Sequence, residues 1–270
     1  MILWNRCSLA GVLWLALASL LQGQPGAPAP QGYLGITSPN LIAVVPPAPA
    51  AGDARDTSDR AIFRATRSAA NSARWVMAQH DADYSVAGLL NAFACSLGVA
   101  PNAGNAPRLE KLLARASTDS NSANAVLKDR YRRKRPFLRD NGPICVPRDE
   151  FLLNSYDYPS GHSMLGWMTG LILAELEPDH AAAILARARA YGESRVFCGV
   201  HTASAVEAGR VAAAALVAEL HAVPEFRQDL EAAGKELAEL RQHHEAELPS
   251  CETESRLVSS SPYFLQAAPR

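Results

Sequence analysis

The chain has 270 residues, which is enough for one sizeable domain or two small ones. Its 26 Lys and Arg residues balance 27 Asp and Glu residues, so no overall field favours nucleic acid or acidic lipid as a partner. Alanine is abundant and runs of β-branched residues are few, which favours an all-α fold in a single compact helical domain.

Residues 1–23 have the composition of an export signal. Arg6 supplies the positive charge, and the stretch from Leu9 to Leu21 is apolar. Because an apolar stretch of roughly 13 residues is too short to span a bilayer, we expect cleavage, with an uncleaved anchor as the alternative. The mature protein is then expected in the periplasm or outside the cell, with no stable membrane insertion.

Cleavage removes Cys7 and leaves an even number of cysteines, which suits an oxidising compartment. The four that remain are Cys95, Cys145, Cys198 and Cys251. Two disulfides in any of three connectivities are compatible with these positions. A bridge between Cys95 and Cys145 would tether a loop to a helix, while Cys198 and Cys251 stay alternative partners. The cysteine spacing fits no zinc site.

Residues 24–57 are rich in Pro, Ala and Gly, which predicts an extended arm that is either laid over the surface or partly disordered. The helical domain is predicted over residues 58–247, with Asp56, Ser58 or Asp59 as the first cap and an irregular tail over 248–270. Further helices are expected near 84–98, 109–113, 120–135, 160–177 and 178–194, from a cap at Ser204, and over 224–244.

Three separated clusters carry cationic or imidazole side chains. They are Lys128-x6-Arg135-Pro136, Pro159-Ser160-Gly161-His162 and Ser194-Arg195-x5-His201. A basic helix is usually a solvated face, and a lone His is more often structural than catalytic. The middle cluster, however, lies where turn residues give way to an apolar helix. Bare backbone N–H groups and the helix dipole make such a start a ready anion site.

Together and in this order, the clusters resemble the three-part motif of the class A bacterial non-specific acid phosphatases. These enzymes belong to the phosphatidic-acid-phosphatase type 2 superfamily, which also includes the vanadium haloperoxidases. The family pattern is Lys-x6-Arg-Pro, Pro-Ser-Gly-His and Ser-Arg-x5-His-x3-Asp. The first two parts are complete here, and the third lacks only its last residue. The resemblance extends from about residue 32 to about residue 245.

The resemblance implies that one set of residues holds phosphate, namely Lys128, Arg135, Ser160, Gly161, His162 and Arg195. It also implies that His201 attacks phosphorus to form a phosphohistidine, and that His162 protonates the leaving alcohol. The cationic side chains would neutralise the charge of the phosphate, so neither a metal nor a cofactor is expected. The implied substrate is a small phosphomonoester, inorganic phosphate is the implied product, and a homodimer is expected. Because nearby cations lower both histidine pKa values, the pH optimum should lie below neutral.

Residue 205 departs from the pattern, since Ala205 stands where the family has Asp. An Asp four residues after His201 would share its helix face, accept the imidazole N–H and stabilise the attacking ring. Alanine cannot do this, and Ser204 or a backbone carbonyl would be a weaker substitute. Ala205→Asp is therefore expected to raise kcat if the activity is impaired. Two alternatives follow: a non-catalytic or weakly active phosphate-binding relative, and a vanadate-dependent haloperoxidase, for whose extra helices the chain lacks room.

Overall fold

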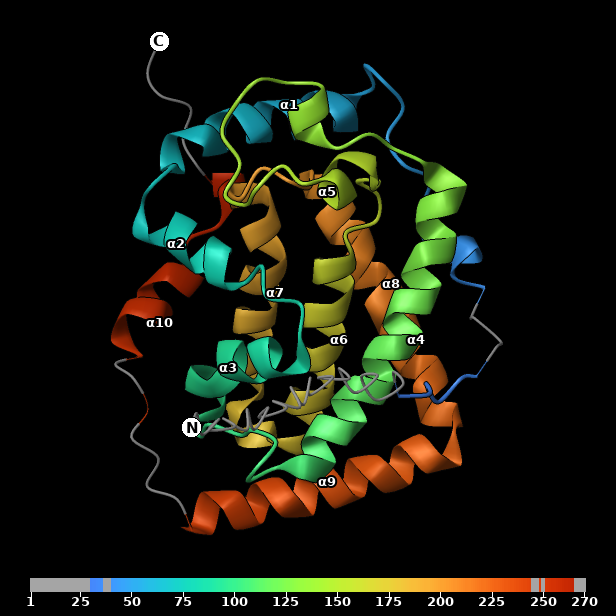
Figure 1. The fold of residues 1–270 in the computed structure, drawn as a ribbon, viewed down its shortest axis with the longest axis vertical. Helices are drawn as coiled ribbons and strands as arrows, with labels where there is room; N and C mark the ends of the chain where they lie inside the picture. The colour runs from blue at the N-terminus through green and yellow to red at the C-terminus, as the bar shows by residue number, and fades with distance from the viewer. Residues whose placement is uncertain (1–29, 36–39, 244–247, 249–250, 265–270) are drawn as a thin grey trace, which may run out of the picture.

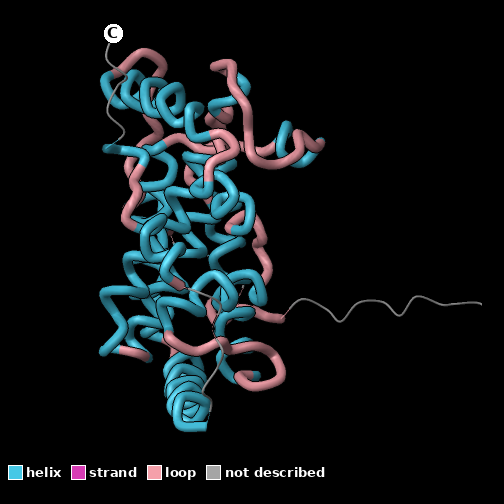
Figure 2. Tube along the Cα trace, turned by 90° about the vertical axis from the view of Figure 1, so that its left-hand side faces the viewer, coloured by secondary structure: helices cyan, strands magenta, loops and turns pink. Residues whose placement is uncertain are grey.

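A computed structural model of the chain describes residues 30–35, 40–243, 248 and 251–264, and the expected export signal lies outside these ranges. The described trace contains helices and loops and no strand, which confirms the predicted all-α class (Figure 2). The α-helices are α1 (Ala54–Thr66), α2 (Ala73–His80), α3 (Val86–Leu97), α4 (Pro107–Tyr131), α5 (Glu150–Asn154), α6 (Gly161–Leu176), α7 (Ala181–Phe197), α8 (Ala203–Ala222), α9 (Pro224–His243) and α10 (Glu252–Val258). Of these described helices, none has the length and apolar character needed to span a membrane.

Helix α6 is the central helix and packs against α7, α8 and α4 (Figure 1). Two glycines allow α7 to approach it closely. A Cβ at Gly166 would lie 2.3 Å from the ring of Tyr191, and one at Gly170 would lie 2.4 Å from the Cβ of Ala188. Helices α1 and α9 cross opposite ends of this bundle (Figure 1). The start of α6 and the ends of α4 and α7 therefore meet at the α1 end.

Helix α4 corrects the sequence-based division of this region into two helices. It runs without interruption from Pro107 to Tyr131 and ends when Arg132 adopts a left-handed conformation with φ 44°. The Ser- and Thr-rich middle of α4 favours a break on propensity alone. Its hydroxyls instead donate to carbonyls four residues back, as Ser117 does to Leu113 O at 2.6 Å and Ser122 to Thr118 O at 2.9 Å.

The described part of the N-terminal arm lies over α4. The N–H of Tyr33 donates to Asp119 on α4 at 2.7 Å, and its hydroxyl donates to Asp229 on α9 at 2.8 Å. Further along, the hydroxyl of Tyr131 donates to Val45 O at 2.8 Å. Helix α1 then begins within the range predicted for the arm, because its cap is Asp53 and none of the three predicted caps.

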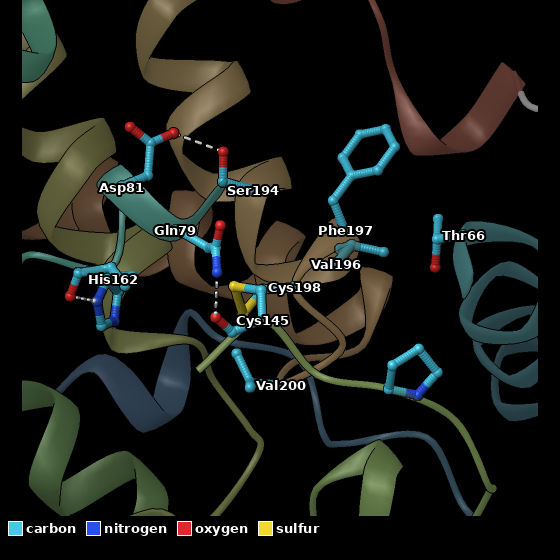
Figure 3. The surroundings of a disulfide bond; sticks show 12 residues. Thr66, Gln79, Asp81, Cys145, His162, Ser194, Val196, Phe197, Cys198 and Val200 are labelled. Atoms are coloured by element: carbon cyan, nitrogen blue, oxygen red, sulfur yellow. Dashed lines mark hydrogen bonds between the residues drawn. A yellow bond between two sulfur atoms is a disulfide. The ribbon is translucent and has the colours of Figure 1, made fainter. Parts of the chain in front are cut away.

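The two disulfides show that the considered Cys95–Cys145 bridge is wrong. Cys95 pairs with Cys251, and Cys145 pairs with Cys198 (Figure 3). The first bridge holds α10, a helix within the tail that was predicted to be irregular, near α3. The second ties the loop before α5 to the end of α7, and Gln79 also holds that loop by donating to Cys145 O at 3.2 Å.

Candidate active site

Residues from all three sequence clusters line one cavity of about 640 Å³. The lining includes Lys128, Arg135, Gly161, His162, Arg195 and His201. Its lining residues come from the ends of α4 and α7, the start of α6 and the segments beside them. These helix ends lie together in Figure 1. The fold thus brings together side chains that are up to 73 residues apart, counting from 128 to 201.

Ser160 closes the start of α6 rather than facing the cavity. Its hydroxyl accepts from Ser163 N at 3.3 Å, and its N–H donates to Ala205 O at 2.9 Å. The next two N–H groups, of Gly161 and His162, are in the first turn and have no acceptor within the helix. The backbone donors available to an anion are therefore those of Gly161 and His162.

Two of the cations come from the end of α4 and the segment after it. Lys128 donates through Nζ to Tyr156 O, and burial together with the Arg135 charge lowers its pKa to about 7. Arg135 is fixed from two sides, by Ser155 Oγ at 2.9 Å and by Val200 O at 2.8 Å. Burial lowers the pKa of Arg135 to about 10, so it stays a cation at neutral pH.

Arg195 is a buried cation of the site with hydrogen-bond donors that lack acceptors in the described part of the chain. Its side chain lies in the last turn of α7 and is 4% exposed, yet Nε and NH1 have no hydrogen-bond partner among the described residues. The preceding residue anchors this turn, because Ser194 Oγ donates to Asp81 and accepts from Arg74 NH1 at 2.8 Å (Figure 3). A buried guanidinium with unmet donors favours an anion as its partner.

His201 is buried beside Arg135 with a defined tautomer. Its Nδ1 lies 2.7 Å from Asp157 O, and a carbonyl oxygen only accepts, so Nδ1 carries the proton. Its Nε2 lies 3.0 Å from Arg135 NH1 and therefore presents a lone pair. Burial first, and then the charges of Arg135, Lys128 and Arg195, lower the pKa of His201 well below its usual value.

His162 has the opposite arrangement. Its Nε2 lies 3.2 Å from Ala82 O and donates to it, which leaves Nδ1 as the atom that exchanges a proton (Figure 3). The ring is held by two tyrosines, with centroids 4.5 Å away for Tyr84 and 6.3 Å for Tyr191. Burial and the Arg195 charge lower the pKa of His162 well below its usual value.

Sequence reasoning missed two buried residues behind this cavity. Asp157 is one of the turn residues that precede the middle cluster, and its carboxylate Oδ1 lies 3.1 Å from His201 Nδ1. Arg133 was read as part of a basic helix, but it lies after α4 and binds Asp56 and Asp59 at 2.9 Å each. The helix after His201 is also capped by Thr202 and not by Ser204 as predicted. In the sequence, nothing except their charge pointed to Asp157 and Arg133, because the partners of these side chains lie far away along the chain.

Comparisons with known proteins identify the family. A family model described as the PAP2 superfamily matches residues 112–229. The chain is 37% identical over 233 residues to a protein of Zymomonas mobilis named acid phosphatase. The aligned region covers 86% of this chain and 88% of that protein. It is 36% identical over 202 residues to a non-specific acid phosphatase of Providencia stuartii, covering 74% and 82%. A non-specific acid phosphatase of Salmonella typhimurium is 34% identical over 195 residues, covering 72% and 78%.

Proposed function

Since the chain belongs to the PAP2 superfamily, among the bacterial non-specific acid phosphatases, we propose that it is a secreted or periplasmic acid phosphatase that works without a metal. Its substrates are small phosphomonoesters, hydrolysed through a phosphohistidine. The observation that carries this proposal is Arg195, whose buried Nε and NH1 donors face no acceptor among the described residues. An anionic phosphoryl group supplies the missing acceptors.

The cations of the cavity suit a phosphoryl group. Arg195 and Arg135 offer planar forks that match phosphate oxygens, and Lys128 adds a compact charge. The N–H groups of Gly161 and His162 bring the positive end of the α6 dipole to the same place. These groups supply the charge stabilisation that metal ions supply in other phosphoryl-transfer enzymes. Within the described ranges, no three His, Cys, Asp or Glu side chains are grouped so that they could hold a metal ion.

The tautomers of the two histidines support the following sequence of steps. His201 Nε2 attacks phosphorus, the N–P bond forms, and the bond between phosphorus and the leaving oxygen breaks. His162 gives the proton on Nδ1 to that oxygen as the alcohol leaves. Water then attacks the phosphohistidine, His162 takes up its proton, and the N–P bond breaks to release phosphate.

The two lowered histidine pKa values set the pH dependence. His201 must be neutral to attack, so activity is lost as the pH falls through its pKa. His162 must be protonated to donate, so activity is lost as the pH rises through its pKa. Because both pKa values lie well below 6.5, the maximum of kcat/KM falls on the acid side of neutrality.

Export is supported by the covalent structure. Both bridges, Cys95–Cys251 and Cys145–Cys198, join segments that are distant in sequence, and such disulfides persist in oxidising compartments. Expression with the intact leader followed by fractionation tests this. Uncleaved protein found in the cytoplasm, with its leader intact and its thiols free, would contradict export.

The test of the activity is turnover of p-nitrophenyl phosphate by the purified protein after EDTA treatment. Undiminished turnover supports the proposal, and activity that is lost with EDTA and restored by Zn²⁺ or Mg²⁺ contradicts it. His201→Ala should abolish turnover and the acid-labile ³²P label while circular dichroism stays unchanged. His221→Ala is the matched control, since His221 lies on α8 and contacts Glu175 at 3.0 Å. Wild-type protein that binds phosphate without turnover would be the non-catalytic relative.

A further inference from the structure

The ring of His201 is backed by a carboxylate that comes from an unexpected segment. Residue 205, four positions later on α8, is a fully buried alanine and offers no side-chain acceptor. Asp157, from the segment before α6, places Oδ1 3.1 Å from His201 Nδ1. We infer that Asp157 is the positioning residue of His201 and takes over the role that an Asp at position 205 would have. This inference rests on the proposed phosphohistidine mechanism.

The carboxylate adds something that the backbone alone does not supply. Asp157 O, at 2.7 Å, already fixes the Nδ1–H tautomer. When Nε2 bonds to phosphorus, however, the ring keeps its Nδ1 proton and becomes a cation. A carboxylate 3.1 Å from Nδ1 stabilises that cation in a dry site, where charges interact strongly. Its effect should therefore appear in kcat, because the charge develops only as His201 attacks.

Asp157 is itself held so that its carboxylate points at the ring. Thr202 N donates to Oδ1 at 3.0 Å, and Thr202 Oγ1 donates to Oδ2 at 2.7 Å. Arg133 NH1 lies 3.4 Å from Oδ2. The side chain is 0% exposed and burial raises its pKa, so these donors take the place of water in stabilising its charged form.

Backbone contact explains how position 157 can do the work of position 205. Ser160 N donates to Ala205 O at 2.9 Å, so the segment before α6 runs directly against the first turn of α8. A carboxylate on the segment before α6 can thus reach the imidazole that a carboxylate on the first turn of α8 would reach.

A purely structural role for Asp157, as a partner of Arg133, is the competing explanation. Asp59 provides the matched control, because it binds the same Arg133 NH1 at 2.9 Å and Ser204 N at 2.8 Å. No described contact joins Asp59 to His201. Asp59→Asn therefore disturbs the buried ion-pair network and leaves the imidazole with its carboxylate.

The experiment compares four proteins on p-nitrophenyl phosphate: wild type, Asp157→Asn, Asp59→Asn, and Asp157→Asn combined with Ala205→Asp. Asparagine keeps the shape of Asp157 and one acceptor oxygen and removes the charge. We expect Asp157→Asn to lower kcat by about 10- to 10³-fold, below the ~10⁴-fold loss for the orienting Asp of a Ser-His-Asp triad. Inhibition by phosphate should change by less than about threefold, since Asp157 does not line the phosphate cavity. Asp59→Asn should keep kcat within about threefold, and Ala205→Asp should recover about tenfold of the loss.

Three results would overturn the inference: an unchanged kcat in Asp157→Asn, an equal loss in Asp59→Asn, or no recovery in the double variant. If Asp157→Asn fails to fold, Ala205→Asp in the wild-type background decides. Because the carboxylate of Asp157 already stabilises the His201 ring, a second carboxylate should not raise kcat. A rise of about tenfold or more would show that the ring lacked one, against the inference. A wild type without turnover would instead refute the proposed function.

Discussion

Titration of Lys128 should control anion binding between pH 7 and pH 9. Burial and the Arg135 charge lower the pKa of Lys128 to about 7, so half of the free protein carries this cation at neutral pH. The two histidines and the two arginines of the cavity change their charge little over this range. The pKa values of His162 and His201 lie well below 6.5, and Arg135 and Arg195, whose pKa values are lowered to about 10, stay mostly charged.

The size of the effect follows from the fraction of protein with Lys128 charged. Near pH 7 that fraction is about one half and near pH 9 about one hundredth, so the apparent Kd should rise about 50-fold if only the charged form binds. Two opposite charges 4 Å apart at an effective dielectric of 20 attract by about 4 kcal/mol, or roughly 10³-fold. The neutral form therefore binds too weakly to hide the 50-fold rise.

Sulfate is the suitable probe, because its charge does not change over this pH range. Calorimetric titration of sulfate at fixed ionic strength should give a Kd that rises steadily above pH 7. Lys128→Arg keeps the cation at every pH and should give a flat profile, whatever its absolute affinity. A flat profile for the wild type, or an unchanged slope in Lys128→Arg, would show that this amine does not titrate near neutrality.

Three further predictions concern packing, cross-linking and buried charge. A Cβ at Gly209 would lie 2.6 Å from a carbonyl of the α6 start, so Gly209→Ala should cost about 1–3 kcal/mol in urea unfolding and lower kcat. Gly234→Ala, where the new Cβ meets a leucine methyl at 3.3 Å, should cost less than about 1 kcal/mol. Replacing Cys145 and Cys198 by Ala opens a link across 53 residues and should lower the unfolding free energy by about 4 kcal/mol, and an unchanged urea midpoint would contradict this. Arg195→Met removes an unpaired buried cation and should raise the unfolding free energy by about 1–3 kcal/mol. Phosphate should no longer stabilise this variant, and a variant less stable than the wild type would refute the account of this site.

Helices and motif residues were readable from the sequence because both depend on local patterns. The apolar run after residue 163 predicts α6, and the ordered clusters predict which side chains share a site. The helix boundaries were harder to predict from the sequence. Ser117 favours a break by propensity, yet its hydroxyl is satisfied inside α4, and Arg132 ends that helix four residues before Pro136.

The partners of the buried charges could not be predicted in the same way. Asp157 meets His201 across 44 residues, and Arg133 meets Asp59 across 74. No spacing rule connects such pairs, since they arise from the packing of the α1 and α8 starts against the segment before α6. The sequence showed that residue 205 lacks a carboxylate, and only the fold showed that Asp157 supplies one.

The charges around the cavity link binding to stability. Lys128, Arg135 and Arg195 face it, while Asp157 lies behind His201 and is engaged by Thr202. Burying cations without enough counter-charge destabilises the free protein, and the unmet donors of Arg195 show where that cost falls. A phosphoryl group entering the cavity meets donors that are already desolvated and fixed by α4, α6 and α7. The same burial that lowers the pKa of Lys128 and of both histidines therefore prepares the site for a dianion.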